Sequence, residues 1–290
     1  MSQRVSRGIA TVAGLLLAGV AAYWIHGWKE RERLALVSAA PSKSPDSPKS
    51  REAAETLASG ALKKATAKPE AGLPLRIGEV LDYTADVGKI SNVADLRVVV
   101  AGRRNFYGTS VWHLQAFAHT HNPLRMVFEL DDQFDSYSDA ANLTTLQYEM
   151  HLHERGHRVD SVERMTTTGK EPAPPNASET RVVPGTRDPL SLLGYLRKVD
   201  WTKTREVRSP VYDGHKLYDV RASFAGSERV SVAAGTFDTK KVNIQVFDNG
   251  QEMNNAHVLL YLAENEARTP VLLETVMPFA TARVELKSTD

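Results

Sequence analysis

Two pairs of histidines have the spacing that places neighbouring side chains on one face of a β-strand. His119 and His121 are separated by one residue, and so are His151 and His153. Side chains two positions apart in a strand point to the same side, so each pair could offer two imidazoles to zinc or another transition metal. The alternative is that both pairs are solvated. If successive strands form hairpins, one strand separates the pairs by roughly 10 Å, too far for a shared ion, so we expect no resident metal.

Carboxylates concentrate in residues 131–139, which read Asp-Asp-Gln-Phe-Asp-Ser-Tyr-Ser-Asp. Calcium prefers oxygen ligands, so this segment is a second candidate metal site. It lacks the glycine and the terminal glutamate of the helix–loop–helix calcium motif. The alternative is a structural turn in which Asp135 and Asp139 accept hydrogen bonds from backbone amides.

Serines and histidines are present in the chain, but no Gly-x-Ser-x-Gly elbow accompanies them. A catalytic triad cannot be inferred from scattered residues. Residues 233–236, Ala-Ala-Gly-Thr, lack the second glycine and the following lysine of a phosphate-binding loop. We expect no enzyme and no cofactor. A hydrolase whose site the sequence does not reveal remains the alternative.

Charge and cysteine content narrow the function classes further. The 290 residues carry 36 Lys plus Arg against 35 Asp plus Glu, a formal net charge of +1. No overall field would therefore concentrate nucleic acid, and we expect no nucleic-acid partner. The chain contains no cysteine. This excludes disulfides, a thiol nucleophile, cysteine-ligated metal and the lipid-modified cysteine of a lipoprotein.

The N-terminal segment has the pattern of a membrane anchor. A basic tail, residues 1–8, precedes an uncharged apolar run over 9–25, and Trp24 and Trp28 stand near its far end. The run is at the short limit for crossing a bilayer, which takes roughly 17–25 residues, and tryptophans favour the membrane interface. We expect an uncleaved transmembrane helix over 9–28. A signal peptide cleaved after residues 20–22, or a buried helix, is the alternative.

Residues 29–72 form a linker rich in Pro, Ser and Ala, with few large apolar side chains. Such a composition cannot bury enough surface to offset the entropy lost on ordering. Its role would be to set the distance between the membrane and the domain of residues 73–290.

From residue 73 on, the dominant pattern is alternation of apolar and polar residues, which predicts strands. In 111–119, Trp112 and Leu114 alternate with polar residues, and in 124–130 Met126 and Phe128 do the same. Because His-Asn-Pro separates these two segments, we expect them to form a hairpin. Further strands are expected over 146–153, 217–224, 229–232, 241–247, 258–263, 271–277 and 281–286. Short connections between them predict a mostly antiparallel sheet.

One segment has a helical pattern instead. Asp188 can cap a helix, Pro189 suits its first position, and leucines follow at helical spacing. The economical arrangement is a mostly β domain, a curved antiparallel sheet or half-barrel with one helix packed on its concave side. The residues that we expect to line this interior are Trp112, Leu114, Met126, Phe128, Tyr148, Met150, Leu192, Leu193 and Leu196. They form either the core of a filled domain or the wall of a ligand cavity.

Five short segments together resemble a known family. They are 77–83 (Ile-Gly-Glu-Val-Leu-Asp-Tyr), 135–139 (Asp-Ser-Tyr-Ser-Asp), 188–197 (Asp-Pro-Leu-Ser-Leu-Leu-Gly-Tyr-Leu-Arg), 232–239 (Val-Ala-Ala-Gly-Thr-Phe-Asp-Thr) and 268–271 (Arg-Thr-Pro-Val). In this order they are similar to the bacterial family called domain of unknown function 3108, over about residues 75–287. The resemblance implies an exported protein and favours a structural turn at 135–139. By looser analogy it implies a half-barrel like the LolA/LolB lipoprotein carriers.

These observations lead to one leading functional hypothesis. We expect a non-catalytic protein of the bacterial cell envelope, held in the inner membrane by a single span, with its C-terminal domain in the periplasm. That domain would bind a lipid or another hydrophobic ligand, or an envelope component. The alternative is a scaffold that docks a protein partner through a sheet edge.

Overall fold

The computed structural model describes residues 73–290 except 128, 155, 170–172, 254–256, 277–280 and 290. The anchor, the basic tail and the linker expected over residues 1–72 lie outside the described residues. Within the described part, no helix is long and apolar enough to cross a membrane.

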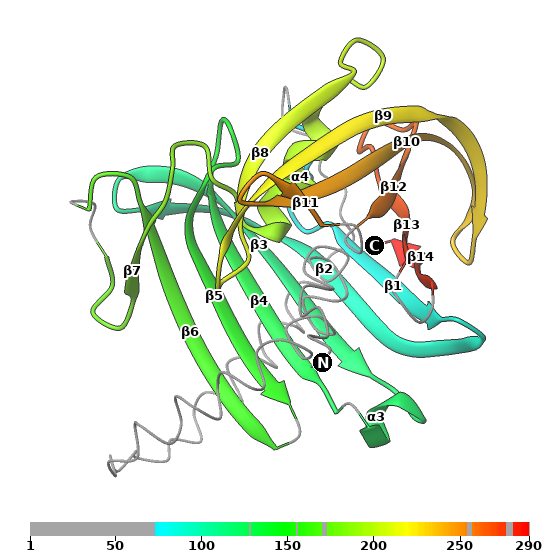
Figure 1. Cartoon of the computed structure of the whole chain (residues 1–290), viewed down its shortest axis with the longest axis horizontal. Coiled ribbons are helices and arrows are strands. Elements are labelled where there is room, and N and C mark those ends of the chain that lie inside the picture. The colour runs from blue at the N-terminus through cyan, green and yellow to red at the C-terminus, as the bar shows by residue number, and fades with distance from the viewer. Residues whose placement is uncertain are drawn as a thin grey trace, which may run out of the picture.

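The described chain forms one curved sheet of fourteen strands, with two helices (Figure 1). Helix α3 (Leu124–Val127) is a single turn, whereas α4 (Pro189–Lys198) is the longer helix. The strands are β1 (Val80–Val87), β2 (Ile90–Phe106), β3 (Thr109–Thr120), β4 (Asp131–Asp139), β5 (Thr145–Glu154), β6 (His157–Thr166), β7 (Ser178–Arg181), β8 (Glu206–Tyr212), β9 (Leu217–Val232), β10 (Gly235–Asp248), β11 (Gln251–Glu252), β12 (Val258–Ala263), β13 (Pro270–Val276) and β14 (Thr281–Thr289).

The order of strands in the sheet is β7-β6-β5-β4-β3-β2-β1-β14-β13-β12-β10-β9-β8, with β11 paired to β10. The sheet therefore consists of two meanders, one from each half of the domain, which meet where β1 pairs with β14. All neighbours are antiparallel except β6 and β7, which are parallel. The expected antiparallel topology is confirmed.

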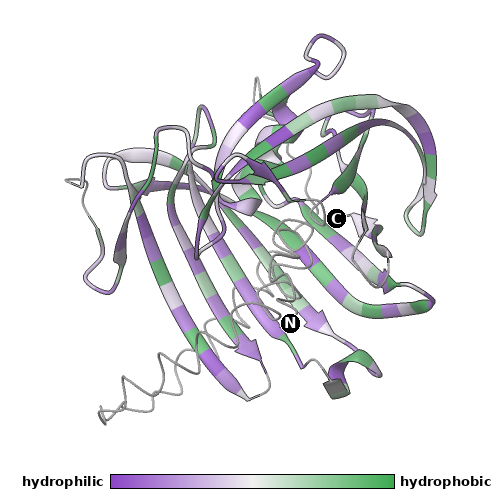
Figure 2. Ribbon diagram, viewed as in Figure 1, coloured by the Kyte–Doolittle hydropathy of each residue, from purple (hydrophilic) through white to green (hydrophobic). Residues whose placement is uncertain are grey.

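The sheet has an inner face, which contacts α4, and an outer face on the opposite side. Along β3, Trp112, Leu114 and Ala116 are buried on the inner face, and the residues between them are less buried. Figure 2 shows this alternation of apolar and polar residues along the long strands. Helix α4 packs against β3, β4 and β8. The expected mostly β fold, one open curved sheet with a helix, is thus confirmed.

One expected strand is wrong. Residues 124–130 do not form the second strand of a hairpin with β3, because residues 124–127 form helix α3. The partner of β3 is β4, in the register Val111↔Asp139 to His119↔Asp131. The acidic segment 131–139 is therefore a strand along its whole length.

Candidate functional site

Most of the predicted lining residues belong to one continuous core around α4. Trp112, Leu114, Leu192, Leu193 and Leu196 are all 5% exposed or less and lie in the same apolar cluster. The helix approaches the sheet closely at Gly194. A Cβ added at Gly194 would lie 3.4 Å from Leu143 Cδ1 and 3.8 Å from Leu114 Cδ1. These five residues are therefore buried members of one core.

Two predicted lining residues lie in a second, separate apolar cluster on the inner face of β5. Tyr148 and Met150 are buried there with Leu152, Met165 and Tyr212. The ring of Phe134 stacks on that of Tyr148 at a centroid distance of 6.3 Å. We call Tyr148, Met150, Leu152, Met165 and Tyr212 the second cluster. It contains two of the chain's six methionines.

The turn between β8 and β9 covers the second cluster. Its Gly214 has φ +92°, a conformation that other residues rarely adopt. A Cβ at that position would collide with the Met150 Sδ and Cε atoms, the flexible end of that side chain, and would lie 3.5 Å from the Tyr148 ring. The positive φ therefore favours glycine in this turn, and the end of Met150 would have to move to admit a larger residue.

The remaining two lining predictions have different outcomes. Met126 is wrong as an interior residue, because it lies on the single-turn helix α3 and its side chain is 83% exposed. The alternation that suggested an inward-facing position belongs to a segment that is not a strand. Phe128 lies outside the described residues.

The first turn of α4 is fixed by a buried polar network around Asp188. One carboxylate oxygen accepts hydrogen bonds from the backbone amides of Leu190 and Ser191, at 2.8 and 2.9 Å. The other accepts from the Ser136 hydroxyl at 2.5 Å and the Thr145 hydroxyl at 2.6 Å. Burial raises the pKa of Asp188, and these hydrogen bonds oppose that rise. The network joins the helix to β4 and β5.

The last turn of α4 is held by a buried ion pair. Arg197 contacts both carboxylate oxygens of Glu79 at 2.8 Å, and the two side chains are 3% and 7% exposed. Arg197 also donates to the backbone carbonyls of Pro74 and Ala267. Arg268 donates to the carbonyls of residues 197–199 at the end of the helix. The first turn of α4 is thus fixed to β4 and β5, and the last turn to the segment before β1 and to the connection between β12 and β13.

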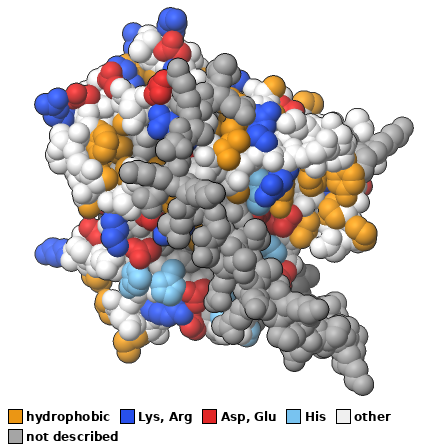
Figure 3. Space-filling view, turned by 180° about the vertical axis from the view of Figure 1, so that it is seen from behind, with side chains coloured by type: hydrophobic (Ala, Val, Ile, Leu, Met, Phe, Trp, Pro, Cys, Tyr) orange, Lys and Arg blue, Asp and Glu red, His pale blue; other side chains and the backbone are white. Residues whose placement is uncertain are grey.

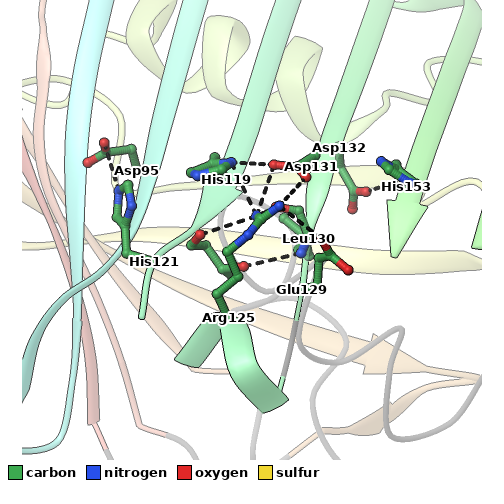
Figure 4. A network of polar contacts seen from close by, with 10 residues as sticks. Asp95, His119, His121, Arg125, Glu129, Leu130, Asp131, Asp132 and His153 are labelled. Atoms are coloured by element: carbon green, nitrogen blue, oxygen red, sulfur yellow. Dashed lines mark hydrogen bonds and ion pairs between the residues drawn. The ribbon is translucent and has the colours of Figure 1, made fainter. Parts of the chain in front are cut away.

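The histidines expected at metal-binding spacing lie in or next to β3 and β5, with β4 between these strands. His119 pairs with Asp131, and His121 pairs with Asp95 at 2.9 Å (Figure 4). Arg125, from α3, donates to both oxygens of Asp131 and holds the pKa of that carboxyl below its ordinary value. The two imidazoles are therefore paired with separate carboxylates.

The two histidines of the second pair, His151 and His153, also contact different carboxylates. The His151 Nε2 lies 3.7 Å from the carboxylate of Glu149, and its Nδ1 lies 2.8 Å from Asp160. These two carboxylates raise the pKa of His151 to about 9. The backbone amide of His153 donates to Asp132. Among the described residues, no group of three His, Asp or Glu side chains has the arrangement of a metal site.

Sequence reasoning missed a buried polar group on the outer face. Asp135 accepts hydrogen bonds from the side chains of Gln115 and Gln133 and lies 2.6 Å from His113 Nε2. Burial works against ionisation here, but these partners hold the pKa of Asp135 below its ordinary value. The expectation that Asp135 binds backbone amides is therefore wrong. Asp139 does so, accepting from Ala141 and Asn142 in the turn after β4.

This group extends into a row of rings. The imidazole of His113 stacks on Tyr137 at 4.6 Å, and Tyr137 stacks on Phe106 at 5.5 Å. Alternation of polar residues along β3 and β4 could have indicated which positions face outward, but not which side chains contact one another.

Figure 3, which shows the molecule from behind, displays hydrophobic, charged and histidine side chains interspersed on its surface.

A family model described as "Protein of unknown function (DUF3108)" matches residues 82–287 of this chain. The chain belongs to the DUF3108 family. The segments that resemble DUF3108 meet mainly at the two ends of α4. Ser136 binds Asp188 at the first turn, whereas Glu79 and Arg268 bind the last turn. These contacts attach both ends of the helix to the rest of the domain.

No curated protein sequence matches this DUF3108 chain significantly. Several solved structures are similar to it, including the following three. A beta-barrel-like protein of domain of unknown function DUF1849 from Brucella abortus is 12% identical, with coverage of 73% of this chain and 96% of its own and a TM-score of 0.47. A putative lipoprotein from Parabacteroides distasonis is 13% identical, with coverage of 76% and 98% and a TM-score of 0.35. A putative exported protein with a YmcC-like fold from Bacteroides fragilis is 11% identical, with coverage of 75% and 98% and a TM-score of 0.30.

Proposed function

We propose that this protein is a non-catalytic component of the bacterial cell envelope whose β domain binds the apolar chain of a lipid or a similar hydrophobic ligand. The binding site would be the second cluster, between the inner face of β4–β6 and the β8–β9 turn. The observation that carries the proposal is that these five buried side chains form an apolar cluster of their own, distinct from the core that holds α4, with Phe134 packed against both. A ligand could contact this cluster without displacing the buried leucines of the helix.

The side chains of the second cluster suit a ligand of variable shape. Met150 and Met165 are unbranched and flexible, and methionine adapts readily to irregular apolar partners. Tyr148, Tyr212 and the adjoining Phe134 supply flat aromatic surfaces. Phe134 is only partly buried, so part of this apolar surface reaches solvent. Apolar walls with few polar groups are typical of sites for lipid tails.

The buried hydroxyl and carboxyl groups support a non-catalytic role. Ser136, Thr145 and Ser191 all contact Asp188 or one another, and these contacts hold the Asp188 side chain that caps the first turn of α4. All four residues are 6% exposed or less. A nucleophile must reach its substrate. Because these hydroxyl and carboxyl groups are buried and hydrogen-bonded in a helix cap, they suit a role in the stability of the domain and not in a reaction.

The envelope location rests on the sequence. The uncharged run over residues 9–25 is followed by a linker that would let the domain stand away from the bilayer. With the basic tail on the cytoplasmic side, the domain would lie in the periplasm. There it could meet lipids that leave or enter the membrane.

The proposal is tested by native mass spectrometry of the full chain, purified from bacterial membranes in mild detergent. We expect one lipid to remain bound after the detergent is removed. Two substitutions on neighbouring strands discriminate the site. Phe134 and Phe117 come from β4 and β3, but they lie on opposite faces of the sheet, since Ala116 pairs with Phe134 and Phe117 pairs with Gln133.

Phe134→Arg should remove the bound lipid, because an unpaired guanidinium beside the second cluster is costly to desolvate. We expect affinity to fall by at least about tenfold, which corresponds to about 1.4 kcal/mol. Phe117→Arg, on the outer face, should retain the lipid as the wild type does. Circular dichroism of both variants controls for folding. A folded Phe134→Arg protein that keeps its lipid, or a wild type that never retains one, would refute the proposed site.

A further inference from the structure

Strand β6 has an open edge over its first six residues. It pairs with β5 from Glu154↔His157 to Gln147↔Arg164, but β7 pairs only with Glu163–Thr166 of β6. Among the described residues, no strand pairs with the other edge of 157–162. Figure 1 shows β6 continuing well beyond the short β7. Free backbone N–H and C=O groups along such an edge are a template for another strand.

The side chains of this edge do not block pairing. Soluble proteins protect open edges with charged side chains, lysine above all, and with proline. Residues 157–162 read His-Arg-Val-Asp-Ser-Val and contain neither lysine nor proline, and their two charges, Arg158 and Asp160, are of opposite sign and pair with each other at 3.1 Å. Residues 157–160 are exposed, and Val159 is an exposed large hydrophobic side chain at 38%. The edge is thus accessible and carries an apolar residue at its centre.

The charges on this edge are complementary to those on the same edge of a second copy of the chain. Arg158 and Asp160 flank Val159 in the sequence and lie on the same face of the sheet as each other. In the register of β5 and β6, Arg158 is opposite His153 and Asp160 is opposite His151. If two copies of β6 pair antiparallel with Val159 opposite Val159, the register places Arg158 of each copy opposite Asp160 of the other. His157 then lies opposite Ser161. Opposite charges directly across a strand pair stabilise it, and an isologous pairing forms both contacts twice.

We propose that the open edge of β6 binds the same edge of a second copy of this chain, in the register centred on Val159. The pairing joins the two sheets into one and satisfies the free backbone groups of both strands. This inference is independent of the second cluster and of any ligand. A pairing of this length is smaller than a standard interface of about 1,600 Å², so the dimer is weak, and covalent trapping is the suitable assay.

The chain contains no cysteine, so single cysteines report the register unambiguously. Directly opposed residues in an antiparallel pair have Cα atoms about 4.5–5.5 Å apart, within the range of about 4.4–6.8 Å for a disulfide. The full-length Val159→Cys protein in detergent or vesicles should therefore form a disulfide dimer under mild oxidation. His157→Cys alone should not, because its two copies would be displaced by four residues, roughly 13 Å. A mixture of His157→Cys and Ser161→Cys should crosslink.

A dimer that forms equally at all three positions, or at none, overturns the proposed pairing. A charge exchange in the Val159→Cys background gives a second test. Arg158→Glu and Asp160→Arg should each reduce crosslinking by at least about tenfold, because like charges then face each other. Mixing the two variants should restore it, since each then offers the charge that the other lacks. Failure of the mixture to crosslink, with both proteins folded by circular dichroism, also overturns the proposal.

Discussion

The buried pair between Arg197 and Glu79 should show strong energetic coupling. Arg197→Met leaves the Glu79 carboxylate buried with its cationic partner gone, and Glu79→Met leaves the guanidinium without its anion. Removing one partner of a buried pair costs about 3–5 kcal/mol, because the remaining charge stays desolvated. Each single variant therefore removes a large part of a total stability of about 5–15 kcal/mol.

The double variant Glu79→Met/Arg197→Met should be more stable than the sum of the two losses predicts. Both buried charges are then absent, and methionine fills part of the space. What remains is the loss of the hydrogen bonds from Arg197 to the carbonyls of Pro74 and Ala267. Leaving a buried acceptor unpaired costs about 1–3 kcal/mol each. Two such acceptors make the expected loss of the double variant about 2–6 kcal/mol, with the centre of that range well below the centre of the about 6–10 kcal/mol for two independent losses.

Urea unfolding followed by tryptophan fluorescence measures this cycle, because Trp112 and Trp201 are buried in the domain. The slope of unfolding free energy against urea concentration must be the same in all four proteins for the comparison to hold. If the double variant loses as much as the two single variants added together, the pair is not coupled, and its role as a clamp on the last turn of α4 is wrong.

Two further predictions concern titratable side chains. Asp188→Ala should destabilise the domain by about 3 kcal/mol or more, because the helix loses its cap and two buried hydroxyls lose their acceptor. Asp188→Asn should destabilise the domain less, because its side-chain oxygen can still accept from the helix amides. Thermal melts of both variants measure the difference. An equal loss in both would contradict the capping role. The pKa of His151 is raised from 6.5 to about 9, so its ion pairs should stabilise the fold fully below pH 6.5, and this contribution should disappear as the pH rises to about 9. The unfolding free energy of the wild type minus that of His151→Gln, measured across this interval, should fall accordingly; a constant difference would refute the assignment.

Local sequence signals predicted the elements that are determined locally. The helix over 189–198 was predictable because its cap, its proline and its leucine spacing all lie within one short segment. Strand β3 was predictable because Trp112 and Leu114 alternate with polar residues.

Strand β4 was missed because its inward positions do not carry the usual apolar residues. Ser136 and Ser138 are small and polar, and Ser136 is needed to bind Asp188. Alternation of hydrophobicity is therefore hidden in this strand, and the nearby 124–130 segment offered a more regular but misleading pattern.

The contacts that fix α4 and the outer face could not be predicted, because they depend on register. Arg197 and Glu79 are 118 residues apart, and the sequence around either residue does not indicate that it contacts the other. Likewise, His113 and Asp135 meet only because β3 and β4 pair in one specific register, which places Asp135 opposite Gln115.

The pairing of β1 with β14 makes the connectivity of this domain effectively circular. Leu81, near the start of β1, lies opposite Thr289, at the end of β14. A short link between the two ends of the domain would turn this pairing into an ordinary hairpin, and the two meanders would become one. New ends could then be opened in the connection between β7 and α4. Such a circular permutant would keep every strand neighbour, but the longest-range pairing in the sheet would become local. Since chains with fewer distant contacts fold faster, the natural position of the ends affects the rate of folding more than the shape that results.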